Sequence, residues 1–210
     1  PEPSALQDNE ADEGRASVSL EGTIIKEGST RLLVPPLISE RGPGRVEGKV
    51  FFNRQMAFNR DVAVVMFRSV IQPRKCLDAM AATGARGVRI CTEAPGEYRF
   101  LINDREPLAG EYIRENVRLN SIGNAGVGTS DLRCLLTREV FDYIDLDPFG
   151  TPIPFLPAAL QGMARKGVLA VTATDIASLC GTHPGKCRRR YMANSQRGPF
   201  MHESGLRILI

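Results

Sequence analysis

The chain has 210 residues, of which 42% are hydrophobic, and its formal net charge is +3. This size allows one α/β domain with a buried core plus a small arm, and it argues against two full domains. No apolar run approaches the roughly 18 to 20 residues of a membrane span. The five scattered cysteines suit reduced thiols better than a disulfide framework. We expect a soluble monomer in the cytoplasm, or in a nucleus or mitochondrion if the source is eukaryotic.

Acidic residues cluster at the beginning of the chain. Residues 1–16 hold five of them with a single arginine and few large apolar groups, which predicts a disordered tail. The rest of the chain is moderately basic, and such a surplus permits a polyanionic partner without requiring one. The sequence begins without Met and stops within the apolar run Leu206–Ile210, which we interpret as a strand cut in the middle. We therefore expect a fragment of a longer protein.

A β-rich arm and linker are predicted for residues 17–56. Two short strands, 23–26 and 31–34, flank the turn 27–30 as in a hairpin. A connection rich in Pro and Gly, 35–48, leads from the hairpin toward the main domain. The main domain is expected to begin with the next element.

That element is a helix predicted for residues 57–70. Apolar side chains recur at helical spacing at Phe58, Val62, Val65 and Met66. We expect this face of the helix to pack on the core.

From residue 75 onward, strands alternate with helices. Strands are predicted at 75–80, 98–103, 140–145 and 167–172, and helices at 84–94, 106–120 and 157–164. A further strand is hard to recognise because residues 123–128 are polar and rich in glycine. Repeated β-α-β units indicate a Rossmann-like α/β fold, a doubly wound and mostly parallel sheet with right-handed crossovers.

Three loops at successive strand ends carry groups that suit a nucleoside cofactor. Residues 78–87 form a small-residue turn that includes Asp78 and Gly84, but the G-x-G-x-x-G pyrophosphate fingerprint is absent. Asp104 follows Gly84 by 20 residues, where an acid can accept from both hydroxyls of a ribose. Asp131 could accept from an adenine amino group. Each acid alone is more often a solvated loop or cap residue, but together, in order and followed by the Asp-Pro-Phe turn, they indicate an S-adenosylmethionine pocket beside a base pocket.

The next strand end carries an acid-Pro-aromatic turn, Asp147-Pro148-Phe149. Such a turn suits a flat heterocycle that bears an amino group. Asp147 can accept from the amine, and the ring of Phe149 offers a face on which the base can stack. The same residues could also form a turn that simply ends a strand.

Five ordered motifs resemble the tRNA (guanine-26-N2)-dimethyltransferase family. They are residues 50–61, 77–87, 145–152, 171–175 and 179–184. The likeness runs from about residue 20 to the end and covers only the methyltransferase half of that family. We expect the family's C-terminal domain, which helps to grip tRNA and can carry zinc-binding cysteines, to be missing from this fragment. The resemblance implies a class I S-adenosylmethionine-dependent methyltransferase domain at 57–210 that transfers one or two methyl groups to the exocyclic N2 of guanine 26 in tRNA.

The resemblance also implies residue roles. Asp147 would be the catalytic carboxylate, and Phe51 and Phe149 would flank the guanine, with Pro148 shaping the turn. Contacts to S-adenosylmethionine would come from Arg60, Arg86, Asp104, Asp131 and the backbone at Leu132. The chain departs from the family at residues 53–56, where Asn-Arg-Gln-Met stands in place of the common Asn-Pro-Arg-Met.

A basic segment, residues 183–191, follows the last motif. Its basic side chains could contact tRNA phosphates beside the base pocket or could form an ordinary solvated face, and they are Lys186, Arg188, Arg189 and Arg190. Cys180, His183 and Cys187 could be drawn as metal ligands, but their spacing matches no common zinc pattern, so no metal is expected.

Two alternatives stay open from the sequence. One is another amino-methyltransferase, acting on DNA adenine or a protein amide, although Phe149 occupies the position where those enzymes commonly have a second Pro. The other is a fragment that binds cofactor or RNA without catalytic competence.

Overall fold

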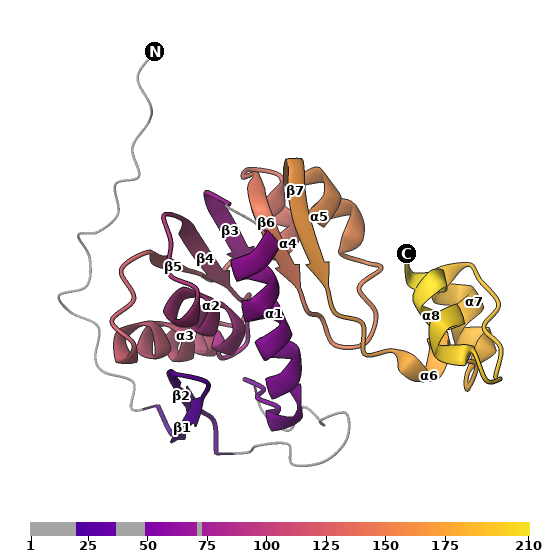
Figure 1. Cartoon of the computed structure of the whole chain (residues 1–210), viewed down its shortest axis with the longest axis horizontal. Coiled ribbons are helices and arrows are strands. Elements are labelled where there is room, and N and C mark those ends of the chain that lie inside the picture. The colour runs from indigo at the N-terminus through magenta and orange to yellow at the C-terminus, as the bar shows by residue number, and fades with distance from the viewer. Residues whose placement is uncertain (1–19, 37–48, 71–72) are drawn as a thin grey trace.

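A computed structural model describes residues 20–36, 49–70 and 73–210. The tail predicted for residues 1–16 and most of the connection 35–48 lie outside the described residues. The described part contains a five-stranded parallel sheet, a separate two-stranded hairpin and three short helices near the end of the chain (Figure 1). The predicted doubly wound α/β fold with an N-terminal hairpin is confirmed.

The central sheet has the strand order β5-β4-β3-β6-β7, and every neighbouring pair is parallel. The strands are β3 (Lys75–Asp78), β4 (Arg99–Asn103), β5 (Ala125–Gly128), β6 (Phe141–Leu146) and β7 (Met163–Val171). The chain runs outward from β3 to β5 and then returns to the other side of β3 for β6. In open α/β sheets, ligands bind at the carboxyl ends of the strands where the order reverses. The reversal here lies between β3 and β6.

Helices cover both faces of this sheet (Figure 1). One face carries α1 (Ala57–Val70), α2 (Ala85–Glu93) and α3 (Pro107–Leu119), and the other carries α4 (Leu132–Leu136) and α5 (Leu156–Gln161). Successive residues of a strand point to opposite faces. Cys76 of β3 therefore joins one hydrophobic core and Leu77 joins the other. Within the described ranges, no helix is long and apolar enough to cross a bilayer.

The hairpin pairs β1 (Thr23–Glu27) with β2 (Thr30–Val34) in antiparallel register. It is fastened to the main domain by Asn116 of α3, which is fully buried. The Asn116 side chain accepts from the backbone N–H of Leu33 at 2.6 Å and donates to the backbone oxygen of Leu33 at 3.0 Å. One amide therefore continues the hydrogen bonding of β2 into the domain, which fixes the hairpin beside α3.

The face of α1 that packs on the core differs from the predicted one. The short 3-10 helix Arg54–Met56 leads into α1, and Ala63, Val64 and Phe67 of α1 are buried against the sheet. The predicted face is exposed, with 77% of Phe58 and 61% of Val65 accessible. Residues Phe58, Val62, Val65 and Met66 are all exposed large hydrophobics. The buried stripe includes Arg60, whose charge breaks the apolar pattern at the sequence level.

The boundary between α5 and β7 also differs from the prediction. The helix predicted for 157–164 ends at Gln161, and β7 already begins at Met163. Gly162 ends the helix against α4, since an added Cβ there would lie 2.5 Å from Leu136 Cδ2. The sequence pattern does not indicate a strand at 163–166, because this part of β7 is polar. Its pairing with β6 also shifts register between Phe141 and Tyr143.

The chain ends in three helices, α6 (Ile176–Leu179), α7 (Pro184–Tyr191) and α8 (Met201–Leu209), which pack around Leu179 and Cys187. The prediction of a strand at 206–210 is therefore wrong. Ile208 and Leu209 pack on this cluster, and Arg207 pairs with Glu203 one turn earlier at 2.8 Å. A short apolar run cannot by itself distinguish a strand from a helix.

Candidate active site

The turn after β3 is shaped by two residues that were predicted to contact a cofactor. Asp78, the last residue of β3, is 2% exposed, and its Oδ2 accepts from the backbone N–H of Gly87 at 3.0 Å. Gly84 has φ 74°, and an added Cβ would lie 3.0 Å from Ile113 Cγ1. Glycine is needed here both for its backbone conformation and for close packing. In the structure these residues build the turn and the start of α2.

Asp104 lies at the carboxyl end of β4 and joins two loops. Its Oδ2 accepts from the backbone N–H of Ala82 at 2.8 Å, and its Oδ1 accepts from that of Glu106 at 3.0 Å. The side chain is only half-buried, and each carboxylate oxygen has a second lone pair. Asp104 can therefore support the turn and still accept from a ligand hydroxyl.

Asn103, which the sequence analysis did not identify, connects the loops that follow β3 and β5. It is 1% exposed, donates to the backbone oxygens of Ala79 and Ser130 at 3.2 and 3.1 Å, and accepts from the N–H of Ser130 at 3.0 Å. Asn103 thus couples the ends of β3, β4 and β5. Only its place at a predicted strand end could have indicated this role.

Asp131 is the N-cap of α4. Its side chain accepts from the backbone N–H of Arg133 at 2.9 Å, and the next residue, Leu132, is buried. The cap places an acid and a helix N-terminus together beyond β5. The sequence analysis did not predict this helix, and the role of Asp131 toward adenine stays a prediction.

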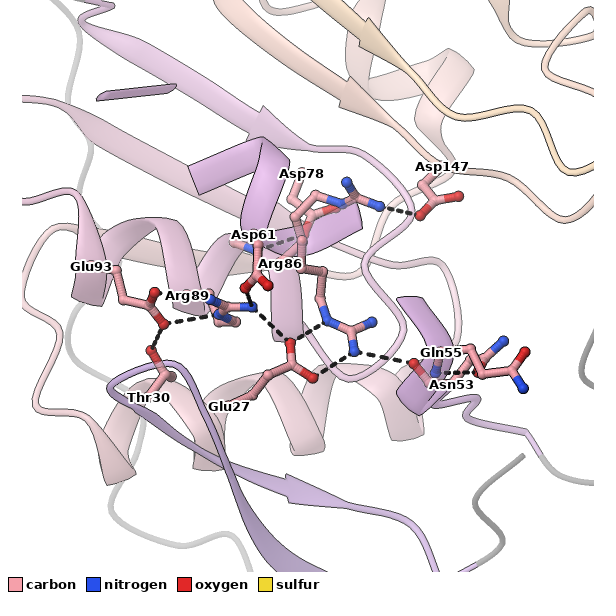
Figure 2. Close-up of polar contacts among 12 residues, drawn as sticks. Glu27, Thr30, Asn53, Gln55, Asp61, Asp78, Arg86, Arg89, Glu93 and Asp147 are labelled. Atoms are coloured by element: carbon pink, nitrogen blue, oxygen red, sulfur yellow. Dashed lines mark hydrogen bonds and ion pairs between the residues drawn. The ribbon is translucent and has the colours of Figure 1, made fainter. Parts of the chain in front are cut away.

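Asp147 follows the carboxyl end of β6 and is paired with Arg86 of α2 (Figure 2). The same guanidinium lies against Asp145, with Arg86 Nε 3.3 Å from Asp145 Oδ1. Asp145 in turn accepts from the hydroxyl of Tyr143 at 2.9 Å. One arginine from the first turn of α2 therefore bridges two acids of the same strand end, an arrangement that the sequence did not predict.

Burial changes the protonation of the acids beneath this pair. It raises the pKa of Asp78 to about 8, and repulsion from Asp145 adds to the effect. Burial also raises the pKa of Asp145, to about 6, although the Arg86 guanidinium opposes the rise. Carboxylates crowded away from water favour their neutral forms. Burial lowers the pKa of Arg86, but attraction to Asp145, Asp147 and Asp78 outweighs burial and raises it above its usual value.

The turn that carries Asp147 is joined to the loop after β7. The N–H of Gly150 donates to Thr174 Oγ1 at 2.9 Å, and the N–H of Thr174 donates to the Gly150 oxygen at 3.0 Å. A third hydrogen bond links the Thr172 N–H to the Leu146 oxygen at 3.0 Å. Two separate sequence motifs, 145–152 and 171–175, therefore form one hydrogen-bonded rim.

Two aromatic rings meet beside this rim. Phe149 is 62% exposed, and its ring centroid lies 4.9 Å from that of Phe51 in an edge-on arrangement. The family resemblance implied that these rings flank a base, and this stays a prediction. Because the rings already touch, a base does not fit between them unless one moves, but the open face of Phe149 is available for stacking.

Arg60 lies in a network that joins the hairpin to α1 and α2. Glu27 and Arg89 of this network are shown in Figure 2. Arg60 donates to both oxygens of Glu27, at 2.6 and 2.7 Å, and to the Asn53 oxygen at 3.1 Å. Arg89, which is 2% exposed, contacts Glu27 at 3.0 Å and Glu93 at 2.9 Å. The sequence assigned Arg60 to a cofactor, whereas its contacts in the structure are with the hairpin and the loop before α1.

Residues 29–210 match the sequence model of the family described as N2,N2-dimethylguanosine tRNA methyltransferase. The chain belongs to this family. It is 41% identical over 210 residues to the tRNA (guanine(26)-N(2))-dimethyltransferase of Pyrococcus furiosus and 38% identical over 189 residues to that of Saccharolobus solfataricus. These matches cover 92% and 89% of this chain.

Solved structures agree with this family membership. Trm1 from Pyrococcus horikoshii, in complex with S-adenosyl-L-methionine, has a TM-score of 0.79 and 38% sequence identity, over 89% of this chain and 52% of that one. Trm5b from Pyrococcus abyssi, at 22% identity and a TM-score of 0.57 over 73% of this chain and 41% of that one, shares the fold. The chain spans about half the length of the curated relatives that it matches, 53% for Pyrococcus furiosus.

In this member of the dimethyltransferase family, the basic residues of α7 are exposed. Lys186, Arg188 and Arg189 have no acidic partner among the described residues, whereas Arg190 pairs with Asp175. Nearby, Cys180 Sγ lies 3.5 Å from His202 Nδ1. Among the residues with described positions, no group of three or more His, Cys, Asp or Glu side chains could hold a metal ion.

Proposed function

We propose that the chain is the methyltransferase half of an enzyme that methylates the exocyclic N2 of guanine 26 in tRNA once or twice, with S-adenosylmethionine as the methyl donor. One observation carries the proposal above all. A partly exposed acid, Asp147, lies beside the open ring of Phe149 at the carboxyl ends of the strands, on the same edge of the sheet as Asp104. The names of the relatives agree with this chemistry.

The residues at this edge fit the proposed cofactor. S-adenosylmethionine, when bound, supplies an electrophilic methyl group on a sulfonium. Asp104 has free lone pairs for the two ribose hydroxyls. Asp131 and the first-turn N–H of Leu132 offer an acceptor and a donor for adenine, since the first N–H groups of a helix lack intrahelical partners. Roles for Arg60 and Arg86 in holding the cofactor stay predictions.

Asp147 would act on the substrate amine. The lone pair of a guanine N2 is delocalised into the ring, which makes the nitrogen a poor nucleophile. A hydrogen bond from N2–H to the Asp147 carboxylate orients the amine and leaves an acceptor in place for the proton that is lost as the N–C bond forms. General-base assistance of this kind is typically worth about 10² to 10⁴ in rate, and alignment of the reacting atoms contributes further.

The base must leave the tRNA stack before it reaches Asp147. Extrusion costs a few kcal/mol, and stacking on an aromatic ring returns about 1 to 3 kcal/mol. The exposed Phe149 ring suits this role, with Pro148 shaping the turn beneath it. Basic side chains of α7, Lys186, Arg188 and Arg189, are exposed and can meet phosphates. A monomeric state and a cytoplasmic location stay predictions from the sequence.

The test is transfer of labelled methyl from S-adenosylmethionine to unmodified tRNA, with identification of the product nucleoside. Label in N2-methylguanine or N2,N2-dimethylguanine is expected, and it should vanish with Asp147→Ala and with a tRNA that lacks guanine at position 26. The assay should be run on this chain and on the full-length protein, because relatives are about twice as long. Label in another nucleoside, or no label with the full-length protein, would refute the substrate assignment.

A further inference from the structure

The acid proposed to act on the substrate lies at the end of a row of side chains on one strand. Tyr143 and Asp145 lie two positions apart on β6, so their side chains point to the same face of the sheet, and Asp147 follows two positions later, just beyond the end of the strand. Tyr143 belongs to the core beneath α2, so this face is the one that α2 covers. Burial decreases along the row, from 1% side-chain exposure at Asp145 to 25% at Asp147. The row therefore leads from the core to the site.

Arg86 links the last two members of the row. It belongs to the first turn of α2, its side chain is 9% exposed, and it uses Nε toward Asp145 and Nη2 toward Asp147 Oδ2. Asp145 is itself held by the Tyr143 hydroxyl at 2.9 Å. A buried acid, itself held by a buried phenol, thus lies behind the guanidinium at ion-pair distance, although its Oδ1 accepts no hydrogen bond among the described residues. Contacts of this kind lock the rotamer of each successive group.

The side chain of Asp147 has few other restraints, although hydrogen bonds at Leu146 and Gly150 hold the backbone of its turn. Asp147 lies beyond the last residue of β6, on the turn before Gly150, which has φ 79° and open space around it. Arg86 occupies Oδ2, and Oδ1 accepts from no neighbour among the described residues. A carboxylate held by one oxygen keeps the other available for a substrate N–H.

We propose that Arg86 is a positioning residue for Asp147, anchored by Asp145 and Tyr143, and that this four-residue chain sets the catalytic carboxylate in its productive orientation. The proposal rests on the proposed function and deepens it. Asp147 acts as an oriented acceptor, and a strongly basic carboxylate is not required, because the N2 proton becomes acidic once the methyl group has been transferred. The N2–CH3 bond forms as the S–CH3 bond breaks, S-adenosylhomocysteine leaves, and the N2 proton passes to Oδ1 of Asp147, which becomes neutral while Oδ2 stays paired with Arg86.

The decisive variants change the anchor and leave in place every side chain that is proposed to contact the cofactor or the base. Asp145→Asn removes the charge behind Arg86, and Tyr143→Phe removes only a hydroxyl, so the fold is preserved at least in the second case. In the full-length protein we expect kcat for N2-methylguanine formation to fall about 10-fold to 100-fold for Asp145→Asn, since misplacement by about 1 Å can cost that much. A smaller fall is expected for Tyr143→Phe. The Kd for S-adenosylmethionine should stay within about 2-fold of wild type.

Asp142→Asn is the matched control, because this acid belongs to the same strand but contacts the backbone N–H groups of Arg74 and Lys75 on the other side. It should leave kcat unchanged. Arg86→Ala should have a lower kcat than wild type, and added methylguanidinium should restore part of it. A purely structural role of Arg86 would not allow this rescue. Wild-type kcat in both Asp145→Asn and Tyr143→Phe, or a fall in kcat that follows a matching loss of cofactor affinity, would overturn the proposal.

A second readout needs no turnover. The side-chain carboxyl ¹³C resonance of Asp147, assigned by its absence in Asp147→Asn, should shift in Asp145→Asn and stay in place in Asp142→Asn. If it shifts while the wild-type protein methylates no tRNA, the positioning chain stands and the proposed function fails. An unmoved resonance in Asp145→Asn would overturn the positioning chain whatever the activity.

Discussion

Glu27 and Arg89 are 62 positions apart in the sequence, yet they form a 3.0 Å ion pair that fastens the hairpin turn to α2. Arg89 is also held by Glu93 at 2.9 Å and by Asp61 at 2.7 Å, and these acids raise its pKa, with the hydrogen bonds from Arg89 to Glu93 as the largest cause. Three acids from the hairpin, α1 and α2 therefore meet at one buried guanidinium. This contact sets the position of the hairpin on the domain.

Loss of this guanidinium should destabilise the folded state. Arg89→Met leaves the acids without their shared cation, and breaking a buried pair by removing one partner costs about 3 to 5 kcal/mol. We expect the free energy of unfolding, measured by urea denaturation, to fall by about 3 kcal/mol. Arg118→Met is the control, since Arg118 forms an exposed pair with Glu115. Its effect should be much smaller, because solvent screens an exposed pair, and equal effects of the two changes would contradict the prediction.

Gly28 should not tolerate a side chain. It has φ 59°, and an added Cβ would lie 2.5 Å from Glu93 Oε1 and 2.7 Å from Arg89 Nη2. A left-handed conformation alone costs a non-glycine residue about 1 to 2 kcal/mol, and displacement of the ion pair adds to this. Gly28→Ala should therefore lower the free energy of unfolding by about 2 kcal/mol or more. Gly123→Ala, where no atom lies within 4 Å of an added Cβ, should change it by less than about 0.5 kcal/mol.

The buried pair Asp78 and Asp145 should make stability depend on pH. Burial raises the pKa values of both carboxyls from 3.8, to about 8 and about 6, so the folded state holds protons that the unfolded chain releases. The contribution of the two protonated carboxyls to the free energy of unfolding is therefore fully present below about pH 4. It is lost as pH rises through about 6 and then 8. Relative to wild type, Asp78→Asn should gain stability as pH increases from about 5 to about 9. Chemical denaturation across this pH range measures the difference in free energy of unfolding between variant and wild type. For Glu203→Gln, an exposed position on α8, this difference should not change with pH.

Asp104 should control cofactor affinity if the proposed function is right. Asp104→Asn keeps one side-chain oxygen for the loop but loses the charge that strengthens hydrogen bonds to ribose hydroxyls. Hydrogen bonds to charged groups contribute about 1.5 to 3 kcal/mol, so the Kd for S-adenosylmethionine should rise about 10-fold to 100-fold. Isothermal titration calorimetry checks this. Affinity that falls equally in the strand variant Asp142→Asn would point to a general loss of structure.

The exposed face of α7 should contribute to RNA binding through charge alone. Arg188→Ala combined with Arg189→Ala removes two cations that have no acidic partner among the described residues, so tRNA affinity should fall for all sequences alike. The slope of log Kd against log salt concentration should decrease in magnitude by about 1 to 2. Arg114→Ala with Arg118→Ala removes two cations already paired on α3 and serves as the comparison. An unchanged slope in the α7 variant would show that this helix does not contact RNA phosphates.

Local sequence patterns are enough to predict the alternation of strands and helices from residue 75 and the sheet edge at which Asp104, Asp131 and Asp147 gather. These features depend on hydrophobic periodicity and on the rule that parallel strands end on the same edge, so they need no knowledge of distant contacts. The motif at 145–152 and the acids at the strand ends can therefore be recognised from the sequence alone.

The contacts of the charged groups, in contrast, depend on the tertiary fold. Arg60 turns to Glu27, and Arg86 bridges Asp145 and Asp147, because the partners come from segments far apart in the chain. The buried face of α1 was missed for the same reason, since a paired arginine interrupts its apolar stripe. A buried charge is tolerable only with its partner, and the fold, rather than the local pattern, supplies that partner.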